Sequence, residues 1–152
     1  MKLKKNISVL CLLALLAGSW NVAALAQGAE TTRVLVTVLH ASNEGNDFNL
    51  ENDAYRDELI KLFSYTSYRQ IGARSASLKK TVPEKVMLPG GYELLLTYQG
   101  DENGRMLVHA LIEKGGEQYV NTVLSSVGGG VVFLGGPPLE NGVIIIVLEM
   151  GF

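Results

Sequence analysis

The sequence is nearly free of cysteine and tryptophan, with one residue of each kind in 152. Both residues, Cys11 and Trp20, lie before residue 27. A lone cysteine cannot close an intramolecular disulfide, and it cannot supply the several thiolates of a structural zinc site. From residue 27 onward, a disulfide, a thiol nucleophile and a cysteine-ligated metal are therefore all excluded.

An excess of positive charge is also missing. The chain has 13 Lys and Arg against 15 Asp and Glu, which gives a formal charge of −2. Three of the lysines and none of the acids lie before residue 27, so the remainder carries 10 basic and 15 acidic residues, a formal charge of −5. Because nucleic-acid binding depends on a basic face that neutralises phosphates, this balance argues against a nucleic-acid partner.

Long apolar runs are absent as well. The apolar run at residues 7–17 is much shorter than the ~20 residues of a transmembrane helix. It follows three lysines and precedes the sequence Ala-Leu-Ala at residues 24–26, a small-residue pattern typical of signal-peptidase cleavage. We therefore predict a signal peptide at residues 1–26 and a single exported domain at residues 27–152. Its expected location is the periplasm, or the outer membrane as an associated protein.

The pattern of apolar residues predicts a domain that is mostly β. Residues 33–42 (RVLVTVLHAS) alternate and are rich in β-branched side chains, which is typical of a strand. Residues 55–63 instead place Tyr55, Leu59 and Phe63 at helical spacing, with Asn52 or Asp53 available as the N-cap. Further strands separated by glycine-rich turns follow from residue 67. We predict an α+β fold in which one strand and one amphipathic helix lead into an antiparallel β-meander or sandwich.

The C-terminal segment 127–152 (VGGGVVFLGGPPLENGVIIIVLEMGF) is rich in glycine but does not match a nucleotide-binding loop. A P-loop needs a lysine where this chain has Gly136, and a dinucleotide-binding loop needs a glycine where it has Phe133. Two short apolar runs, residues 131–134 and 143–150, are joined by a loop rich in Gly, Pro and Asn, which predicts a closing β-hairpin. Because the second run is apolar on both faces, we expect this chain or a partner to cover both sides.

The order of features in residues 92–150 resembles the C-terminal part of the β-domain in the outer-membrane secretin family. That family has a hairpin arm of the form G-x-x-V-x-x-G-G, followed by a last strand rich in Leu and Ile. The matching segments here are GGVVFLGG, in which Gly135 and Gly136 are the paired glycines, and VIIIVL. The resemblance implies a secretin-like hairpin and an envelope or secretion context. Secretins are far longer and carry a long insert where this chain has only PPLENG, so the resemblance does not imply a pore.

An acidic loop offers one candidate metal site. If the first residue of the set is position 1 of a calcium loop, oxygen-bearing side chains also stand at positions 3, 5, 7 and 12. The set is Asp47, Asn49, Glu51, Asp53 and Glu58. Asn52 stands where such a loop needs glycine, so a solvated loop with helix-capping acids is the competing interpretation. We predict no cofactor.

Two histidines, His40 and His109, are the remaining candidates for acid–base chemistry. They lack the spacing of an HExxH motif, and no GxSxG motif supplies a serine nucleophile. A hydrogen-bonded group of His40, Ser42 and Asp47 is conceivable, but nothing in their spacing requires it. We therefore predict no catalytic residue and a non-enzymatic protein.

These observations favour a non-enzymatic module of the bacterial cell envelope. It would bind an envelope protein partner or self-associate, for instance by adding a strand at an exposed sheet edge. The expected interface lies on the closing hairpin, at Val131, Phe133, Gly135, Gly136, Ile145 and Val147. A small outer-membrane β-barrel is the alternative, because apolar residues alternate before Phe152, and a periplasmic small-ligand-binding protein or hydrolase is the third interpretation.

The exported protein is expected to begin at Gln27. Signal peptidase cleaves after small residues, a requirement that Ala24 and Ala26 meet. The intact mass of the protein recovered from the host envelope should then correspond to residues 27–152. A mass that includes Cys11 would contradict the cleavage and would indicate an anchored form.

Overall fold

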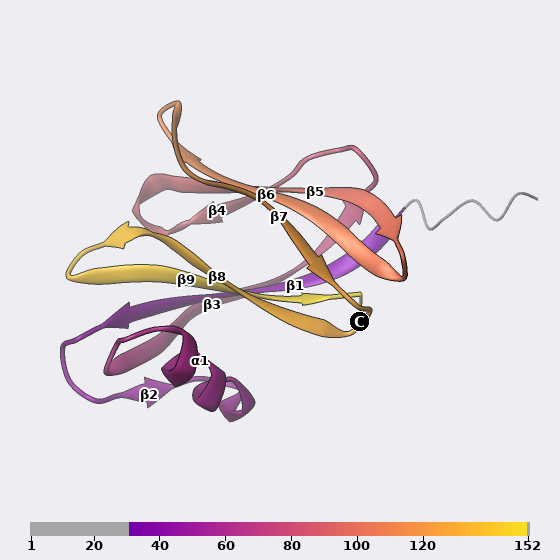
Figure 1. Ribbon diagram of the computed structural model, residues 1–152. Coiled ribbons are helices and arrows are strands. Elements are labelled where there is room, and N and C mark those ends of the chain that lie inside the picture. Colours follow the sequence, from indigo (N-terminus) through magenta and orange to yellow (C-terminus); the bar gives the residue numbers. More distant parts are fainter. Residues whose placement is uncertain (1–30, 152) are drawn as a thin grey trace, which may run out of the picture.

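The computed structural model describes residues 31–151 (Figure 1), so the predicted signal peptide lies outside the described residues. This part of the chain is mostly β with one short α-helix, which confirms the predicted fold class. The elements are β1 (Thr31–Ser42), β2 (Phe48–Asn49), η1 (Asp53–Tyr55), α1 (Arg56–Leu62), β3 (Ser67–Lys79), β4 (Glu84–Leu88), η2 (Pro89–Gly91), β5 (Tyr92–Glu102), β6 (Arg105–Lys114), β7 (Glu117–Ser126), β8 (Gly130–Leu139) and β9 (Gly142–Met150).

The strands form two sheets that pack face to face (Figure 1). One sheet has five strands in the order β2-β3-β1-β9-β8, and the other has four strands in the order β4-β5-β6-β7. Every named pair is antiparallel except β2 with β3. The four-stranded sheet is a simple meander. The closing hairpin β8–β9 instead returns to the other sheet, where β9 pairs with β1.

Turn chemistry sets the reversals of the meander. Between β5 and β6 the chain reverses at Asn103 and Gly104, whose φ angles are 52° and 74°. Both residues lie in the left-handed region that a tight hairpin turn requires and that asparagine and glycine tolerate best. The Asn-Gly pair therefore sets the register of the hairpin that was predicted from it.

The main core lies between the two sheets. On β1, every second residue faces this core, namely Val34, Val36 and Val38. On β5 the same holds for the face that begins with Tyr92 and Leu94. Alternation with a period of two is what places one set of side chains on one face of a strand. Burial of these apolar faces stabilises the sandwich by roughly 25 cal/mol for each Å² removed from water.

A second apolar cluster lies on the outer face of the five-stranded sheet, beneath α1 (Figure 1). Leu59 of α1 and Tyr55 pack there against Ile145 and Val147 of β9. Tyr68 of β3 donates hydrogen bonds from its hydroxyl to the carbonyls at the C-terminal end of the helix, that of residue 59 at 3.2 Å and that of residue 63 at 3.0 Å. Burial raises the pKa of the Tyr68 hydroxyl above its usual value. The helix is therefore held by both packing and hydrogen bonds.

The helical segment begins at the predicted cap, but as a 3-10 turn, and α1 itself starts only at Arg56. The Asn52 side chain accepts a hydrogen bond from the backbone N–H of Ala54 at 3.0 Å, which caps the short 3-10 turn that leads into α1. The α-helical part then spans only 7 residues. Within residues 31–151, no helix combines the length and apolar character needed to cross a membrane.

Strand β9 is covered on both faces by this chain. Ile144, Ile146 and Leu148 point into the main core, whereas Ile145 and Val147 point into the cluster beneath α1. This confirms the expectation that the last strand is buried on both sides. It also corrects the predicted interface, because Ile145 and Val147 are 0% exposed and cannot meet a partner while the helix is docked.

Replacing Ile146 with Ala is expected to lower the free energy of unfolding by about 2–5 kcal/mol, because it opens a cavity in the main core. Ile145→Ala should cost a similar amount, since the helix layer is part of the same fold. Ile60, which is 51% exposed on α1, supplies the matched control. Ile60→Ala should change stability by less than about 0.5 kcal/mol. Urea unfolding measures all three; equal stability of Ile146→Ala and Ile60→Ala would mean that β9 does not anchor the sandwich.

Candidate functional site

The two open sides of the sandwich differ in charge and in strand length. On one side lie β4, which has 5 residues and carries Glu84 and Lys85, and β3, of which the 2-residue β2 covers only Tyr68 and Arg69. On the other side lie β7 and β8, each of 10 residues and each paired along one edge only. Short strands and charged side chains are the usual means of blocking unwanted strand pairing. The first side therefore carries charged side chains along its edges, including Arg74 and Lys79 of β3, whereas residues 118–139 on the second side carry none.

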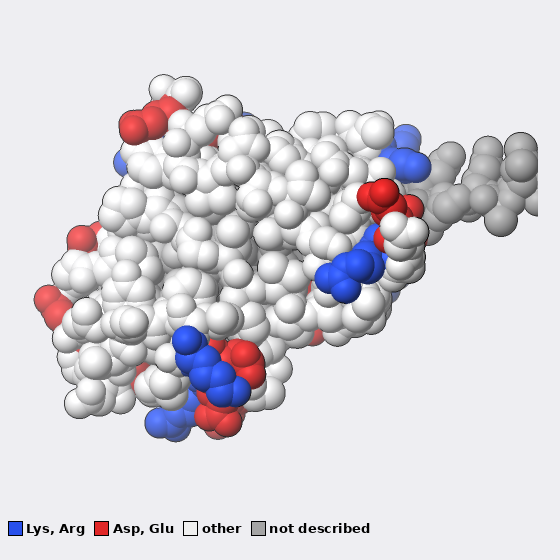
Figure 2. All heavy atoms as spheres, in the orientation of Figure 1, with Lys and Arg blue, Asp and Glu red and all other residues white. Residues whose placement is uncertain are grey.

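The β7–β8 side carries little charge, although the Arg105 guanidinium of β6 donates to the Ser125 side chain and backbone carbonyl on β7. From residue 118 to residue 139 the chain contains no Lys, Arg, Asp, Glu or His. In Figure 1 β7 and β8 lie at the front, and the same view in Figure 2 shows a broad uncharged area with charged side chains near its margins. Large apolar side chains reach the solvent in this segment, namely Tyr119, Val123, Val127 and Val131. We call this side of the molecule the uncharged edge.

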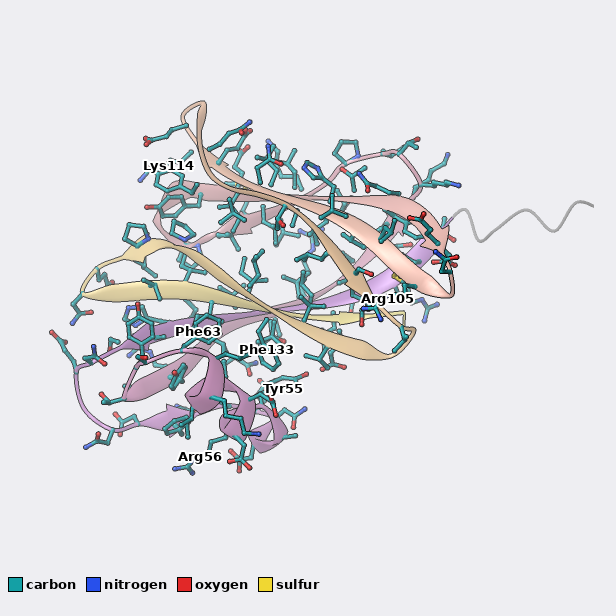
Figure 3. The ribbon with its side chains drawn as sticks, in the orientation of Figure 1. Tyr55, Arg56, Phe63, Arg105, Lys114 and Phe133 are labelled. Atoms are coloured by element: carbon teal, nitrogen blue, oxygen red, sulfur yellow. The ribbon has the colours of Figure 1, made fainter. Side chains whose placement is uncertain are left out.

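Most of the predicted interface residues lie on the uncharged edge. Val131 of β8 is 39% exposed, Gly135 is exposed, and Phe133 and Gly136 are half-buried. The Phe133 ring meets the Tyr55 ring edge to face, with the two centroids 5.8 Å apart (Figure 3), and the Tyr55 hydroxyl donates to the Glu149 carboxylate. These contacts hold the middle of β8 against the helix layer.

The paired glycines have a structural reason. A Cβ added at Gly136 would lie 2.9 Å from the carbonyl oxygen of Ile144, so only glycine allows β8 to approach β9 this closely. The pairing shifts register between Gly135 and Pro138, which is a β-bulge. Pro137 and Pro138 then lack backbone N–H groups. The part of β8 that can pair with another strand is therefore residues 130–136.

A second feature is a polar pocket at the end of the five-stranded sheet where β1 stops and the β8–β9 hairpin turns. The turn of that hairpin lies at the left of Figure 1. Its volume is ≈ 250 Å³. Strands β1 and β3 supply part of the wall, and the loops after β1 and β8 supply the rest. The lining residues are His40, Ser42, Glu44, Asp47, Ser67, Arg69, Glu140 and Asn141.

The pocket walls continue the inward faces of β1 and β3. In the antiparallel register His40 lies opposite Arg69, and Ser42 lies opposite Ser67. Along most of β1 the side chains that point inward are valines. At this end of the strand the inward side chains are His40 and Ser42. Of the five polar residues that are buried among residues 31–151, His40, Ser42 and Ser67 line this one pocket.

The acidic loop at the mouth is tied down by hydrogen bonds. The backbone N–H of Tyr68 donates to the carbonyl of Asp47 at 2.8 Å, and the Thr66 hydroxyl donates to the carbonyl of Gly45 at 2.7 Å. These bonds join the loop after β1 to the start of β3. The carboxylates of Glu44 and Asp47 are therefore carried on a loop whose backbone is fixed.

Hydrogen bonds within the pocket determine which atoms are free. His40 Nε2 lies 3.2 Å from the carbonyl oxygen of Leu139, and because a carbonyl only accepts, Nε2 carries the proton and Nδ1 is the acceptor in the neutral ring. The Ser42 hydroxyl accepts from the backbone N–H of Glu44 at 3.4 Å. Within residues 31–151 the Ser67 hydroxyl has no hydrogen-bond partner, and because no fully buried side-chain oxygen there is left unpaired, this hydroxyl is open to the pocket space. In the described segment no hydrogen bond joins either serine to His40.

The proposed calcium ligands do not converge. Asp47 lines the pocket, Asn49 lies in β2, and Glu58 pairs with Lys61 on α1 at 3.0 Å. In the part of the chain that the structure describes, no group of three or more His, Cys, Asp or Glu side chains is placed to hold a metal ion. The interpretation as a calcium loop is therefore wrong. The chain enters β2 and a 3-10 turn instead of wrapping around a metal ion.

The second histidine lies away from both features. His109 is on the outer face of β6, where Nε2 lies 2.7 Å from the Asn121 side-chain oxygen of β7. This is a cross-strand contact between neighbouring residues on one sheet face. Nothing in the described segment brings His109 together with His40.

No protein-family model, curated protein or solved structure matches this chain. The candidate sites therefore rest on the structure of this chain alone, and they are the uncharged edge and the polar pocket.

The glycine pattern predicts the hairpin that carries Val131 and Phe133. The sequence does not predict that Ser67, Arg69 and Glu140 meet, because they reach the pocket only through the pairing of β3 and β9 with β1. One signal was present in the sequence: the alternation that places valine at residues 34, 36 and 38 of β1 continues with His40 and Ser42.

Gly142→Ala is expected to destabilise the protein and to distort the pocket. An added Cβ would overlap the carbonyl oxygen of Ala41 and lie 2.9 Å from His40 Nε2. Such a clash should cost at least about 1–3 kcal/mol. Gly72 of β3 is the control, since nothing lies within 4 Å of its ideal Cβ. Gly72→Ala should be neutral or slightly stabilising. Thermal melting separates the two, and equal melting temperatures would mean that β1 and β9 are not this closely paired.

Proposed function

We propose that this protein is a non-enzymatic module of the bacterial cell envelope that assembles by strand pairing at the β8 edge. The observation that carries the proposal is the uncharged edge, where residues 130–136 of β8 have a partner on one side only. The envelope location is supported by the predicted signal peptide and by the secretin-like hairpin.

Strand pairing suits this surface for two reasons. The unpaired backbone N–H and C=O groups of an edge strand supply the main-chain hydrogen bonds of a strand-addition complex. The exposed side chain of Val131 and the half-buried ring of Phe133 supply apolar contacts next to them. A partner strand would satisfy the backbone groups and cover this apolar surface together.

The proposed partner is a second copy of the same chain. Two copies of β8 can pair antiparallel about a twofold axis, which makes each surface its own complement. Because residues 118–139 carry no charge, the approach of two identical edges meets no electrostatic repulsion there. The pairing would join the five-stranded sheets of the two copies into one continuous sheet.

A single charge on β8 should test the proposal. The wild-type protein is expected to sediment as a dimer with a concentration-dependent monomer fraction. Val131→Lys should weaken the dimer by at least about tenfold, or about 1.4 kcal/mol, because it places two lysines at the junction. Val82→Lys is the matched control, since Val82 is 48% exposed in the connection between β3 and β4, away from β8.

Hydrogen exchange provides a second readout that does not depend on a variant. Backbone amides of residues 130–136 should become more protected as the protein concentration rises, whereas the amides of β4 should not change. A wild-type protein that remains monomeric at all concentrations would overturn self-association, as would equal weakening by the Val131 and Val82 variants. Melting curves of both variants confirm that each is folded.

A further inference from the structure

The lining of the polar pocket is rich in negative charge and in hydrogen-bond acceptors. The carboxylates of Glu44, Asp47 and Glu140 face one guanidinium, that of Arg69. Within residues 31–151, none of these four side chains forms an ion pair with another residue. The pocket therefore has a net negative charge that the described chain leaves unbalanced.

Two neutral acceptors lie deeper in the wall. His40 Nδ1 is an acceptor because Nε2 donates to the carbonyl of Leu139. Ser67 is 8% exposed, and its hydroxyl has no hydrogen-bond partner within residues 31–151. No fully buried side-chain nitrogen or oxygen in the described segment lacks a partner, so this hydroxyl reaches the pocket space. A ligand there can donate a hydrogen bond to it.

We propose that this pocket binds a primary ammonium group. An ammonium has three N–H donors and no acceptor, which complements a site with His40 Nδ1, the Ser67 hydroxyl and several carboxylates. A volume of ≈ 250 Å³ accommodates the ammonium and a stem of a few carbons. The ammonium is either that of a free small amine or that of a lysine side chain on a polypeptide.

Other ligand classes fit the pocket less well. An anion would meet three carboxylates against one guanidinium. A divalent metal ion needs several converging ligands, and the described residues contain no group of three or more His, Cys, Asp or Glu side chains placed for one. A large apolar ligand would leave the polar lining without hydrogen bonds. Charge and hydrogen-bond chemistry thus agree on an organic cation.

Calorimetric titration of the purified protein with three compounds tests the proposal. Nα-acetyl-L-lysinamide carries the ammonium on a polypeptide-like backbone, n-butylamine carries it without the backbone, and Nα-acetyl-L-norleucinamide has a similar chain without the charge. We expect saturable binding of both amines and none of the norleucine compound. Lysinamide binding about tenfold tighter than butylamine binding would indicate a polypeptide lysine as the source, and equal binding would indicate a free amine.

Variants of the lining assign the binding to this pocket. Asp47→Asn and Glu140→Gln each remove one charge without changing the shape of the side chain, and Ser67→Ala removes a hydroxyl that makes no hydrogen bond within residues 31–151. Each should weaken amine binding by about fivefold or more while leaving the melting temperature unchanged. Glu102→Gln, at the exposed end of β5, is the matched control and should bind like the wild type.

Arg69→Gln gives a test of opposite sign. Arg69 is exposed and is the only guanidinium in the lining, so its removal should make amine binding tighter, by about threefold or more. Weaker amine binding in this variant would overturn the proposal. So would saturable binding of the norleucine compound, the absence of amine binding at about 10 mM, or equal weakening by the Glu102 control. None of these results depends on whether β8 forms a dimer, since the pocket and the uncharged edge are separate surfaces.

Discussion

The pairing of β1 with β9 is the constraint on which the rest of the structure depends. The two strands are in register from Val34 opposite Met150 to Ser42 opposite Gly142, and they lie at the centre of the five-stranded sheet. Ile144 and Ile146 fill the core between the sheets, while Ile145 anchors the helix layer. Since both apolar layers use β9, loss of this strand would expose both at once. The chain joins its first and last described strands, so neither layer is complete until the C-terminal hairpin has docked.

Both candidate sites follow from this arrangement. Because β9 occupies the centre, β8 becomes the outermost strand, and its uncharged edge is left facing solvent beside β7. At the other end of the pairing, β1 extends to Ser42 and keeps the same inward face, now carrying His40 and Ser42. Gly142 permits the close approach there, and the turn that contains Glu140 and Asn141 closes the pocket. One strand pair thus sets the position of a surface for association and of a polar cavity.

Much of the fold could be predicted from local patterns. The alternation in β1 and β5, the helical stripe before β3, the Asn52 cap and the Asn103–Gly104 turn all describe interactions between residues close in the chain. The apolar character of residues 143–148 on both faces correctly indicated a doubly covered strand. Which layers cover this strand depends on packing between residues that are far apart in the sequence. Ile145 and Val147 were therefore placed in an interface when α1 in fact covers them.

The sequence by itself determined the element types, the turns and the lack of charge along residues 118–139. These properties depend on composition and on spacing of a few residues, which are fully present in the linear chain. Only the tertiary structure decided that β8 is an edge and that Ser67, Arg69 and Glu140 meet His40 around one cavity. Those residues lie up to 100 positions apart in the sequence, and their proximity results from strand order and register. The physical reason is that burial of apolar faces selects the strand pairing, and the pairing then places the polar residues at its ends.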